Sequence, residues 1–190
     1  MRVISGASSG LPAGFIGRVG HYRHRVFVER LGWPLATQDD SESDQFDRND
    51  TVYLAVEDED GHIAGCARLL PTTQPYLLSE VFPQLLNGLP PPHDRRVWEL
   101  SRFAAMDFNQ RSTTPLAQFG RSATALLMRE AMRCARRRGA DRLITVSPLG
   151  IERLIRRLGI RSHRAGPPMR IGGHAVFACW IELQGAPYAP

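Results

Sequence analysis

Four short segments within the first 103 residues place charged side chains among apolar and aromatic ones. The segments are YRHRVF with LGW after it (22–27 and 31–33), ESDQFD (42–47), CARLLPTT (66–73) and WELSRF (98–103). An arginine that faces a protein core needs an anionic partner, because burying an unpaired charge is very costly. The fold must therefore bring these arginines to carboxylates, and the acidic segment is the obvious source of them.

The rest of the composition indicates one globular domain over residues 1–190. The chain is 43% hydrophobic and 23% charged, which is ordinary for a soluble domain. Its three cysteines, at 66, 134 and 179, have no metal-type spacing and predict free thiols in a reducing compartment. No stretch approaches the roughly 20 apolar residues of a membrane span, and we expect no signal peptide. These features favour a cytoplasmic protein.

The formal charge of +5 is unevenly distributed along the chain. Residues 39–60 hold ten acidic residues and one arginine, whereas residues 121–170 hold thirteen arginines and three acidic residues. An acidic stretch suits a cationic ligand, and a basic stretch suits an anionic partner. Two solvated faces are the alternative that charge alone leaves open.

Hydrophobic periodicity predicts strands and helices that alternate around one sheet. Helices are expected at 15–31, within 76–86, at 121–138 and at 151–158, and strands at 51–57, 62–70, 97–104, 143–147 and 175–183. Loops or turns are expected at 34–50, 58–61, 89–94 and 107–115. The fold class is therefore α/β (α+β), a three-layer sandwich with a mixed central sheet flanked by helices.

The acidic loop carries three carboxylates, Glu42, Asp44 and Asp47, within six residues. They repel one another unless a positive charge offsets them. The segment lacks the glycine and the terminal glutamate of an EF-hand calcium loop. A cationic ligand, a network with arginines and a simple solvated loop remain as interpretations.

Two aromatic residues, Phe27 and Trp33, lie near the end of the first expected helix. Phe27 alone is most simply a core residue, whereas Trp33 follows the helix end. Aromatic faces attract cations, onium groups included, by about 0.5–2 kcal/mol. Arg23 is spaced to share a helical face with Phe27, and Arg25 is not. Arg23 would then pair with a carboxylate of the acidic loop or of a ligand.

A regular strand at 97–104 would separate its two charged residues. Alternation places Arg102 with Trp98 and Leu100, and Glu99 with Ser101 and Phe103. A site shared by Glu99 and Arg102 would therefore need a bulge or a site wrapped round the strand end. A purely structural ion pair is the alternative for either residue.

The order and spacing of these segments resemble the acyl-homoserine-lactone synthases, the LuxI-type autoinducer synthases. Eight positions match the family's characteristic residues: Arg23, Phe27, Trp33, Asp44, Asp47, Arg68, Glu99 and Arg102. Glu42, Ser101 and Phe103 match residues common in the family. The resemblance extends over roughly residues 22–165.

The resemblance implies a fold similar to the GNAT acetyltransferases and a two-step reaction. The amine of S-adenosylmethionine attacks the thioester of an acyl group on acyl-carrier protein, which gives an amide. The methionyl carboxylate then attacks the carbon next to the sulfonium, closes the lactone and expels methylthioadenosine. The product is a quorum-sensing signal. No metal or resident cofactor is implied, because S-adenosylmethionine is a substrate.

The resemblance also assigns roles to individual residues. Glu99 is the expected general base, directly or through water, with Glu42 as the alternative. The substrate-binding residues implied are Arg23, Phe27, Trp33, Asp44, Asp47, Arg68, Ser101, Arg102, Phe103 and Thr145. The arginines would tie the acidic loop to the sheet, and one would bind the substrate carboxylate. Backbone N–H groups near Ser101 would receive the thioester oxygen, and Thr145 would touch the acyl chain.

The acyl donor is inferred from a difference between this sequence and the GNAT enzymes that use coenzyme A. GNAT enzymes that use coenzyme A often have a Q/R-x-x-G-x-G/A loop that binds pyrophosphate at a helix start. Here the segment 118–123 has arginine where the first glycine belongs. This favours an acyl-carrier protein, which is acidic and would dock on exposed arginines. The docking residues expected are Arg133, Arg137, Arg153 and Arg157.

Two other functions compete with the synthase. One is a GNAT-type N-acyltransferase that uses acyl-coenzyme A and a different amine. The other is an arginine-rich regulatory or nucleic-acid-binding domain, although no recognition motif accompanies the arginines. We therefore expect no nucleic-acid partner.

Overall fold

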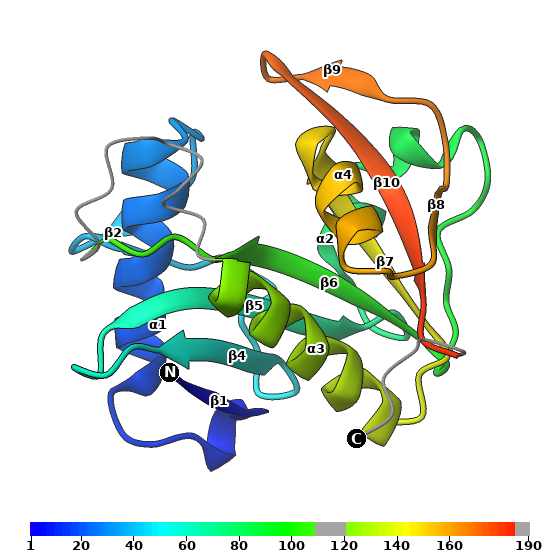
Figure 1. Cartoon of the computed structure of the whole chain (residues 1–190). Coiled ribbons are helices and arrows are strands. Elements are labelled where there is room, and N and C mark those ends of the chain that lie inside the picture. Colours follow the sequence, from blue (N-terminus) through cyan, green and yellow to red (C-terminus); the bar gives the residue numbers. More distant parts are fainter. Residues whose placement is uncertain (109–120, 185–190) are drawn as a thin grey trace. The chain divides into compact units, whose positions relative to one another are not determined.

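The chain folds into two units that interleave along the sequence (Figure 1). The first unit contains Met1–Arg68 and Arg102–Ala131, and the second contains Leu69–Ser101 and Met132–Pro190. The computed structural model describes residues 1–108 and 121–184. Three elements contribute residues to both units: β5 (Ile63–Pro71), β6 (Val97–Ala104) and α3 (Arg121–Arg137).

The first unit combines strands with the N-terminal helix. Its other elements are β1 (Arg2–Ala7), η1 (Ser8–Gly10), α1 (Phe15–Arg23), η2 (His24–Arg30), β2 (Thr37–Gln38), β3 (Ser41–Glu42) and β4 (Val52–Glu57). The strand order is β1-β4-β5-β6, and β1 pairs with β4 in antiparallel register. The β-branched and aromatic residues of β4 suit a strand that is buried along its whole length.

The core of the first unit lies where α1 packs on the strands. Phe15, Val19 and Tyr22 come from one face of α1 at helical spacing, and Tyr53 and Ala55 come from alternate positions of β4. Each large apolar side chain buried in this way contributes about 1.5–3 kcal/mol. The core holds the N-terminal helix firmly against the sheet.

Helix α1 continues as the π-helical segment η2. The Leu31 N–H donates to the carbonyl of Val26 at 3.0 Å, which is the i to i+5 spacing of a π-helix. Val26 and Phe27 of this segment are both buried. Gly32 then ends the helix with a φ of 66°. The helix expected at 15–31 is confirmed, but its second half is not an α-helix.

The second unit contains the parallel part of the sheet. Its strand order is β5-β6-β7-β10-β8, and β9 also pairs with β10. β6 and β7 are parallel, whereas β10 is antiparallel to β7, β8 and β9. The remaining elements are α2 (Leu77–Val81), η3 (Pro83–Leu86), β7 (Arg142–Pro148), α4 (Gly150–Arg157), β8 (Ser162–Arg164), β9 (Met169–Ile171) and β10 (His174–Glu182). The sheet is therefore mixed, as the sequence predicts.

Short edge elements are where the sequence-based expectations fail. Periodicity does not predict β1, β8 or β9, and the loop expected at 34–50 contains the small β2–β3 hairpin. Strands β2, β3, β8 and β9 have two or three residues each, too few for a clear pattern. β1 has six residues, as many as β4, but its sequence RVISGA does not alternate between apolar and polar residues. Most of the loop expected at 107–115 and half of the segment 118–123 lie outside the described residues.

The backbone of β6 changes course at Arg102. Its φ of 51° lies in the left-handed region, which costs a non-glycine residue about 1–3 kcal/mol. The positive φ at this one residue departs from the extended geometry of the rest of β6.

Two expectations from composition can be compared with the fold. Cys66, Cys134 and Cys179 are buried and free, as their spacing predicts. Within the described ranges, 1–108 and 121–184, no helix is long and apolar enough to cross a membrane.

Two glycines of α1 should respond in opposite ways to alanine. A Cβ on Gly20 would lie 2.2 Å from the Oγ of Ser41, whereas a Cβ on Gly17 would meet nothing within 4 Å. We expect Gly20→Ala to lower the free energy of unfolding by about 1–3 kcal/mol through overpacking. Gly17→Ala should raise it by about 0.5–1 kcal/mol through helix propensity. Urea unfolding of both variants tests this, and equal effects would contradict the close packing of α1 on β3.

Candidate active site

Three arginines and three carboxylates form one buried ion-pair cluster in the first unit. The arginines come from α1, β5 and β6, and the carboxylates come from β3 and the loop that follows it. The members are Arg23, Arg68, Arg102, Glu42, Asp44 and Asp47. The arginine side chains are at most 5% exposed. Three positive and three negative charges therefore balance within the cluster. This arrangement is the one expected if the acidic loop forms a network with arginines.

Every carboxylate of the cluster contacts two or more arginines. Glu42 accepts from the Nε of Arg23 at 2.5 Å and from the Nη2 of Arg102 at 2.9 Å. Asp44 accepts from Arg68 at 2.6 Å and from Arg102 at 2.9 Å. Asp47 accepts from Arg23 and Arg68, both at 2.9 Å. Charge-assisted hydrogen bonds of this length are the strong kind, and they offset the cost of burying six charges.

Local hydrogen bonds shape the loop that presents these carboxylates. The Asp44 side chain accepts the N–H of Phe46, and the Asp47 side chain accepts the N–H of Asp44. Thr51 accepts the N–H of Arg48 and donates to the carbonyl of Phe46. Asp and Thr side chains commonly stabilise turns in this way. The loop is therefore preformed by its own short-range contacts.

The arginines keep the carboxylates ionised. Burial alone would raise the pKa of Glu42, but its hydrogen bonds to Arg102 and Arg23 outweigh burial and lower that pKa. Burial likewise opposes ionisation of Asp47, and the charges of Arg23 and Arg68 still hold its pKa far below the usual range. Glu42 is consequently a weak proton acceptor at neutral pH.

An aromatic stack adjoins the cluster. Phe27, from η2, stacks on Trp33 with a centroid distance of 5.1 Å and an interplanar angle of 26°. The Arg102 guanidinium lies 5.6 Å from the centre of the Phe27 ring. Arg25 is exposed and lies 4.1 Å from the centre of the Phe108 ring instead. Arg23, and not Arg25, therefore joins the buried cluster, as the helical spacing predicts.

Glu99 occupies a separate environment in the second unit. Its side chain is fully buried, and its two carboxylate oxygens accept the N–H groups of Leu77 at 3.1 Å and Leu78 at 2.7 Å. These N–H groups belong to the first turn of α2, where helix donors have no partner within the helix. The first turn of α2 thereby fixes the orientation of the Glu99 carboxylate.

The parallel strands part next to Glu99. The register of β6 with β7 runs from the Val97–Arg142 pair to the Glu99–Ile144 pair. Beyond this point β6 continues to Ala104, while β7 continues to Pro148 beside β10. Glu99 is thus the last residue of β6 that pairs with β7. The end of this pairing forms a fork between β6 and β7.

Two further predicted residues are buried in the second unit. Ser101 is 5% exposed and Thr145 is 4% exposed. The Thr145 hydroxyl lies 3.4 Å from the Ser147 hydroxyl, and the backbone of Thr145 lies opposite Cys179 of β10 in the sheet. Phe103 belongs to the first unit and is only partly buried.

Sequence reasoning missed several polar groups that support these residues. The Tyr53 hydroxyl donates to Asp47 at 3.0 Å, and the Cys66 thiol donates to the carbonyl of Arg102 at 3.3 Å. Burial raises the pKa of the Cys66 thiol to about 12, so it remains protonated as a donor. The position of Tyr53 in the strand that follows the acidic loop is the one sequence feature that could have indicated its contact with Asp47.

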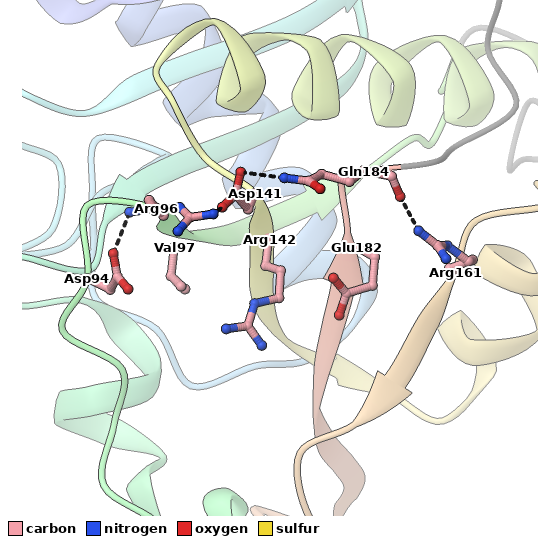
Figure 2. Close-up of a pocket in the computed structure, with 8 residues that line it drawn as sticks. All are labelled: Asp94, Arg96, Val97, Asp141, Arg142, Arg161, Glu182 and Gln184. Carbon is pink, nitrogen blue, oxygen red and sulfur yellow. Dashed lines mark hydrogen bonds and ion pairs between the residues drawn. The ribbon is translucent and has the colours of Figure 1, made fainter.

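Two other polar places do not match the predicted site. A hollow of 310 Å³ in the second unit is lined by Asp94, Arg96, Val97, Asp141, Arg142, Arg161, Glu182 and Gln184 (Figure 2). Its charges contact one another, since Arg96 pairs with Asp141 and Arg161 donates to the carbonyl of Gln184. At the β4–β5 turn, one ligand atom each of Asp58, Asp60 and His62 lie within 4.8 Å. Asp58 there accepts two backbone N–H groups, as turn residues do.

We expect Asp47→Asn to lower the free energy of unfolding, because Asp47 is one of the three carboxylates of the cluster. The substitution weakens the pairing of Arg23 and Arg68, and breaking a buried ion pair costs about 3–5 kcal/mol. Because the pKa of Asp47 is lower in the folded state, its contribution is present above about pH 4 and is lost as the pH falls below that value. The variant should therefore also lose part of the acid dependence of unfolding.

Urea unfolding between pH 3 and 7 measures both effects. Asp50→Asn is the matched control, because Asp50 lies in the same loop and pairs with Arg48 at the surface. This control should change stability by less than about 1 kcal/mol. Equal losses in the two variants, or an unchanged acid dependence in Asp47→Asn, would contradict the cluster.

Known proteins of one family match nearly the whole length of this chain. The model of the autoinducer synthase family matches residues 13–187. An acyl-homoserine-lactone synthase of Acinetobacter nosocomialis is 50% identical over 183 residues, which cover 96% of this chain and 100% of that protein. One of Ralstonia solanacearum is 50% identical over 190 residues, 98% of this chain and 91% of that protein.

Solved structures extend the comparison. TofI, in a ternary complex with an inhibitor and MTA, has a TM-score of 0.85 and 45% identity over 98% of this chain and 94% of its own. The AHL synthase LasI has a TM-score of 0.86 and 33% identity over 97% and 91%. BjaI, a CoA-dependent acyl-homoserine lactone synthase, has a TM-score of 0.81 and 25% identity over 96% and 82%.

A structure described as an N-acetyltransferase from Lactobacillus plantarum is 18% identical with a TM-score of 0.62 over 96% of this chain and 97% of its own, and shows likeness of fold alone. The GNAT-like fold and the mixed sheet flanked by helices are thereby confirmed. The matched region extends over residues of both units. The chain belongs to the autoinducer synthase family, the acyltransferases that act as acyl-homoserine-lactone synthases.

Proposed function

We propose that residues 1–190 act as one catalytic domain that acylates S-adenosylmethionine with an acyl group carried by acyl-carrier protein. The amine nitrogen forms a bond to the thioester carbon, and the carrier thiol leaves. The methionyl carboxylate then forms a bond to the carbon beside the sulfonium, and methylthioadenosine leaves. TofI and BjaI have been solved with MTA, the second product of this reaction, which supports S-adenosylmethionine as the amine substrate.

The observation that carries the proposal is the buried carboxylate of Glu99 at the fork of β6 and β7. Before the first step, the substrate ammonium must lose a proton to become nucleophilic. A carboxylate held by two backbone N–H groups has a fixed orientation, which suits a base that must meet the substrate proton in a defined geometry. We assign Glu99 as the general base, acting directly or through water.

Glu42 is better suited to an anchoring role. Its two oxygens accept from Arg23 and Arg102, and its pKa is lowered by these contacts. Glu42, Asp44 and Asp47 hold the three arginines in place. The cluster as a whole is neutral, so its carboxylates do not supply a free negative charge for the sulfonium.

The remaining predicted residues have roles that fit their surroundings. Phe27 and Trp33 would wall the S-adenosylmethionine pocket with aromatic faces, which attract a sulfonium. Among the described residues, the buried Nη2 of Arg23 has no hydrogen-bond partner and lies 4.0 Å from Asp44, which favours this arginine for the substrate carboxylate. Backbone N–H groups from Ser101 to Phe103 would receive the thioester oxygen. Thr145 would contact the acyl chain.

Replacement of Glu99 tests the assignment of the base. Glu99→Gln keeps the shape of the side chain and removes the proton acceptor. We expect kcat to fall by at least about 100-fold, which is typical for loss of a general base. Release of methylthioadenosine measures the rate, and circular dichroism checks the fold. Near-normal turnover in a folded variant would remove Glu99 from this role.

Exposed arginines on α3 and α4 support acyl-carrier protein as the donor. Arg133 and Arg137 are exposed on α3, and Arg153 and Arg157 are exposed on α4. Carrier proteins are acidic, so such residues would steer their approach. Acyl-coenzyme A is the alternative, because BjaI is a CoA-dependent relative with 25% identity.

Charge reversal tests the docking residues. Arg153→Glu with Arg157→Glu should raise the KM for acyl-carrier protein by about 10-fold or more, since like charges then repel. The KM for S-adenosylmethionine should change little. Arg170→Glu, an exposed arginine of β9 outside the proposed docking set, is the control. Parallel changes in both KM values would contradict docking at α4.

The test of the whole proposal is mass spectrometry of the products. The purified protein is incubated with S-adenosylmethionine and with matched sets of acyl-carrier proteins and acyl-coenzyme A esters of different chain length. A higher kcat/KM with a carrier protein, with one dominant lactone and methylthioadenosine, supports the proposal. A higher kcat/KM with a coenzyme A ester would overturn the carrier-protein assignment. No lactone from any donor would overturn the reaction.

A further inference from the structure

The carboxylate of Glu99 is held by a very short helix. Helix α2 has five residues, and its first two N–H groups, from Leu77 and Leu78, bind the two oxygens of Glu99. An isolated helix of this length is not stable in water, because nucleation costs more than the few hydrogen bonds return. Other contacts must therefore fix the turn that aims these two N–H groups.

Ser79 supplies the contacts that close this turn. Its hydroxyl donates to the carbonyl of Tyr76 at 2.8 Å and accepts the N–H of Tyr76 at 3.3 Å. Tyr76 is the residue before the helix and has an extended backbone, with φ of −140° and ψ of 165°. One hydroxyl thus contacts both polar groups of the residue that precedes Leu77 and Leu78, and the carbonyl of that residue also accepts the N–H of Glu80 at 3.1 Å. The carboxylate of Glu80 is a weaker acceptor for this hydroxyl, at 3.4 Å.

The ring of Tyr76 anchors the same turn from the other side. Its side chain is buried, and its hydroxyl donates to the carbonyl of Pro92 at 2.8 Å. Burial and the nearby charge of Glu99 raise the pKa of Tyr76, so the hydroxyl remains a neutral donor. These contacts fix the position of Tyr76. The hydrogen bonds between Tyr76 and the Ser79 hydroxyl then hold the first turn of α2 relative to Tyr76.

We propose that Ser79 is a positioning residue for the reaction, because its hydroxyl holds the turn whose N–H groups orient the Glu99 carboxylate. The inference rests on the proposed function, in which Glu99 accepts the ammonium proton. A base must lie within hydrogen-bond distance of that proton, and small displacements of reacting groups cost large factors in rate. Ser79 does not touch the substrate and acts through Glu99.

The test is a double-mutant cycle of Ser79→Ala and Glu99→Gln, measured as methylthioadenosine release with S-adenosylmethionine and the most active acyl donor of the panel. We expect Ser79→Ala to lower kcat by about 10-fold and to change the KM for S-adenosylmethionine by less than about 2-fold. It should also shift the acidic limb of the kcat–pH profile, because the hydrogen bonds to Glu99 change. Ser79→Thr keeps the hydroxyl and should restore both properties.

The decisive comparison is made in the Glu99→Gln background. If Ser79 acts through Glu99, Ser79→Ala should lower kcat by less than about 2-fold there. Asp94→Ala is the control, since it deletes another side-chain acceptor that binds a backbone N–H of the second unit, that of Arg96. It should lower thermal stability and leave the pH profile unchanged.

Three results would count against the proposal. A full 10-fold loss in the Glu99→Gln background would show that Ser79 acts independently of Glu99. Reduced stability of Ser79→Ala with normal kcat and pH profile would make Ser79 purely structural. Near-normal turnover of Glu99→Gln itself would instead overturn the assignment of the base, and the role of Ser79 would fall with it.

Discussion

Balanced burial of six charges is the constraint on which the first unit depends. Arg23, Arg68 and Arg102 are drawn from a helix and two strands, and their carboxylate partners come from one short stretch of loop and strand. None of these arginines could be buried without those partners, because an unpaired guanidinium in the interior is strongly destabilising. The acidic loop therefore acts as a common counter-ion that joins three elements. Its own turns are preformed, so joining them costs less conformational entropy.

The two groups of acidic residues differ in what holds them. Glu42 and Asp47 are bound by arginines, which lower their pKa and make them poor proton acceptors. Glu99 instead accepts backbone N–H groups from α2 at the end of its pairing with β7. Arginine contacts suit an anchoring role, whereas the two backbone contacts fix the orientation of the Glu99 carboxylate. The contrast in environment separates two roles that residue type alone does not separate.

Irregular backbone is concentrated next to these groups. The π-helical segment η2 buries Phe27 beside the guanidinium of Arg102, and Arg102 itself has a left-handed backbone. Both features cost free energy relative to regular geometry. The ion pairs of Arg102 and the hydrogen bond from Cys66 to its carbonyl hold the strained residue in place. Strain of this kind commonly accompanies functional sites, because it places side chains where a regular strand would not.

The sequence by itself determined the long elements, the mixed α/β class and the residues of the cluster. Periodicity over 8 to 17 residues identified β6 and α3, and the cost of buried charge required Arg23 and Arg68 to find carboxylates. Only the tertiary structure decided which carboxylate meets which arginine, because those residues lie 19 to 60 positions apart. It also determined the π-helical turn, the left-handed backbone of Arg102 and the hydrogen bonds from α2 to Glu99. These features depend on packing between distant segments, which local periodicity does not encode.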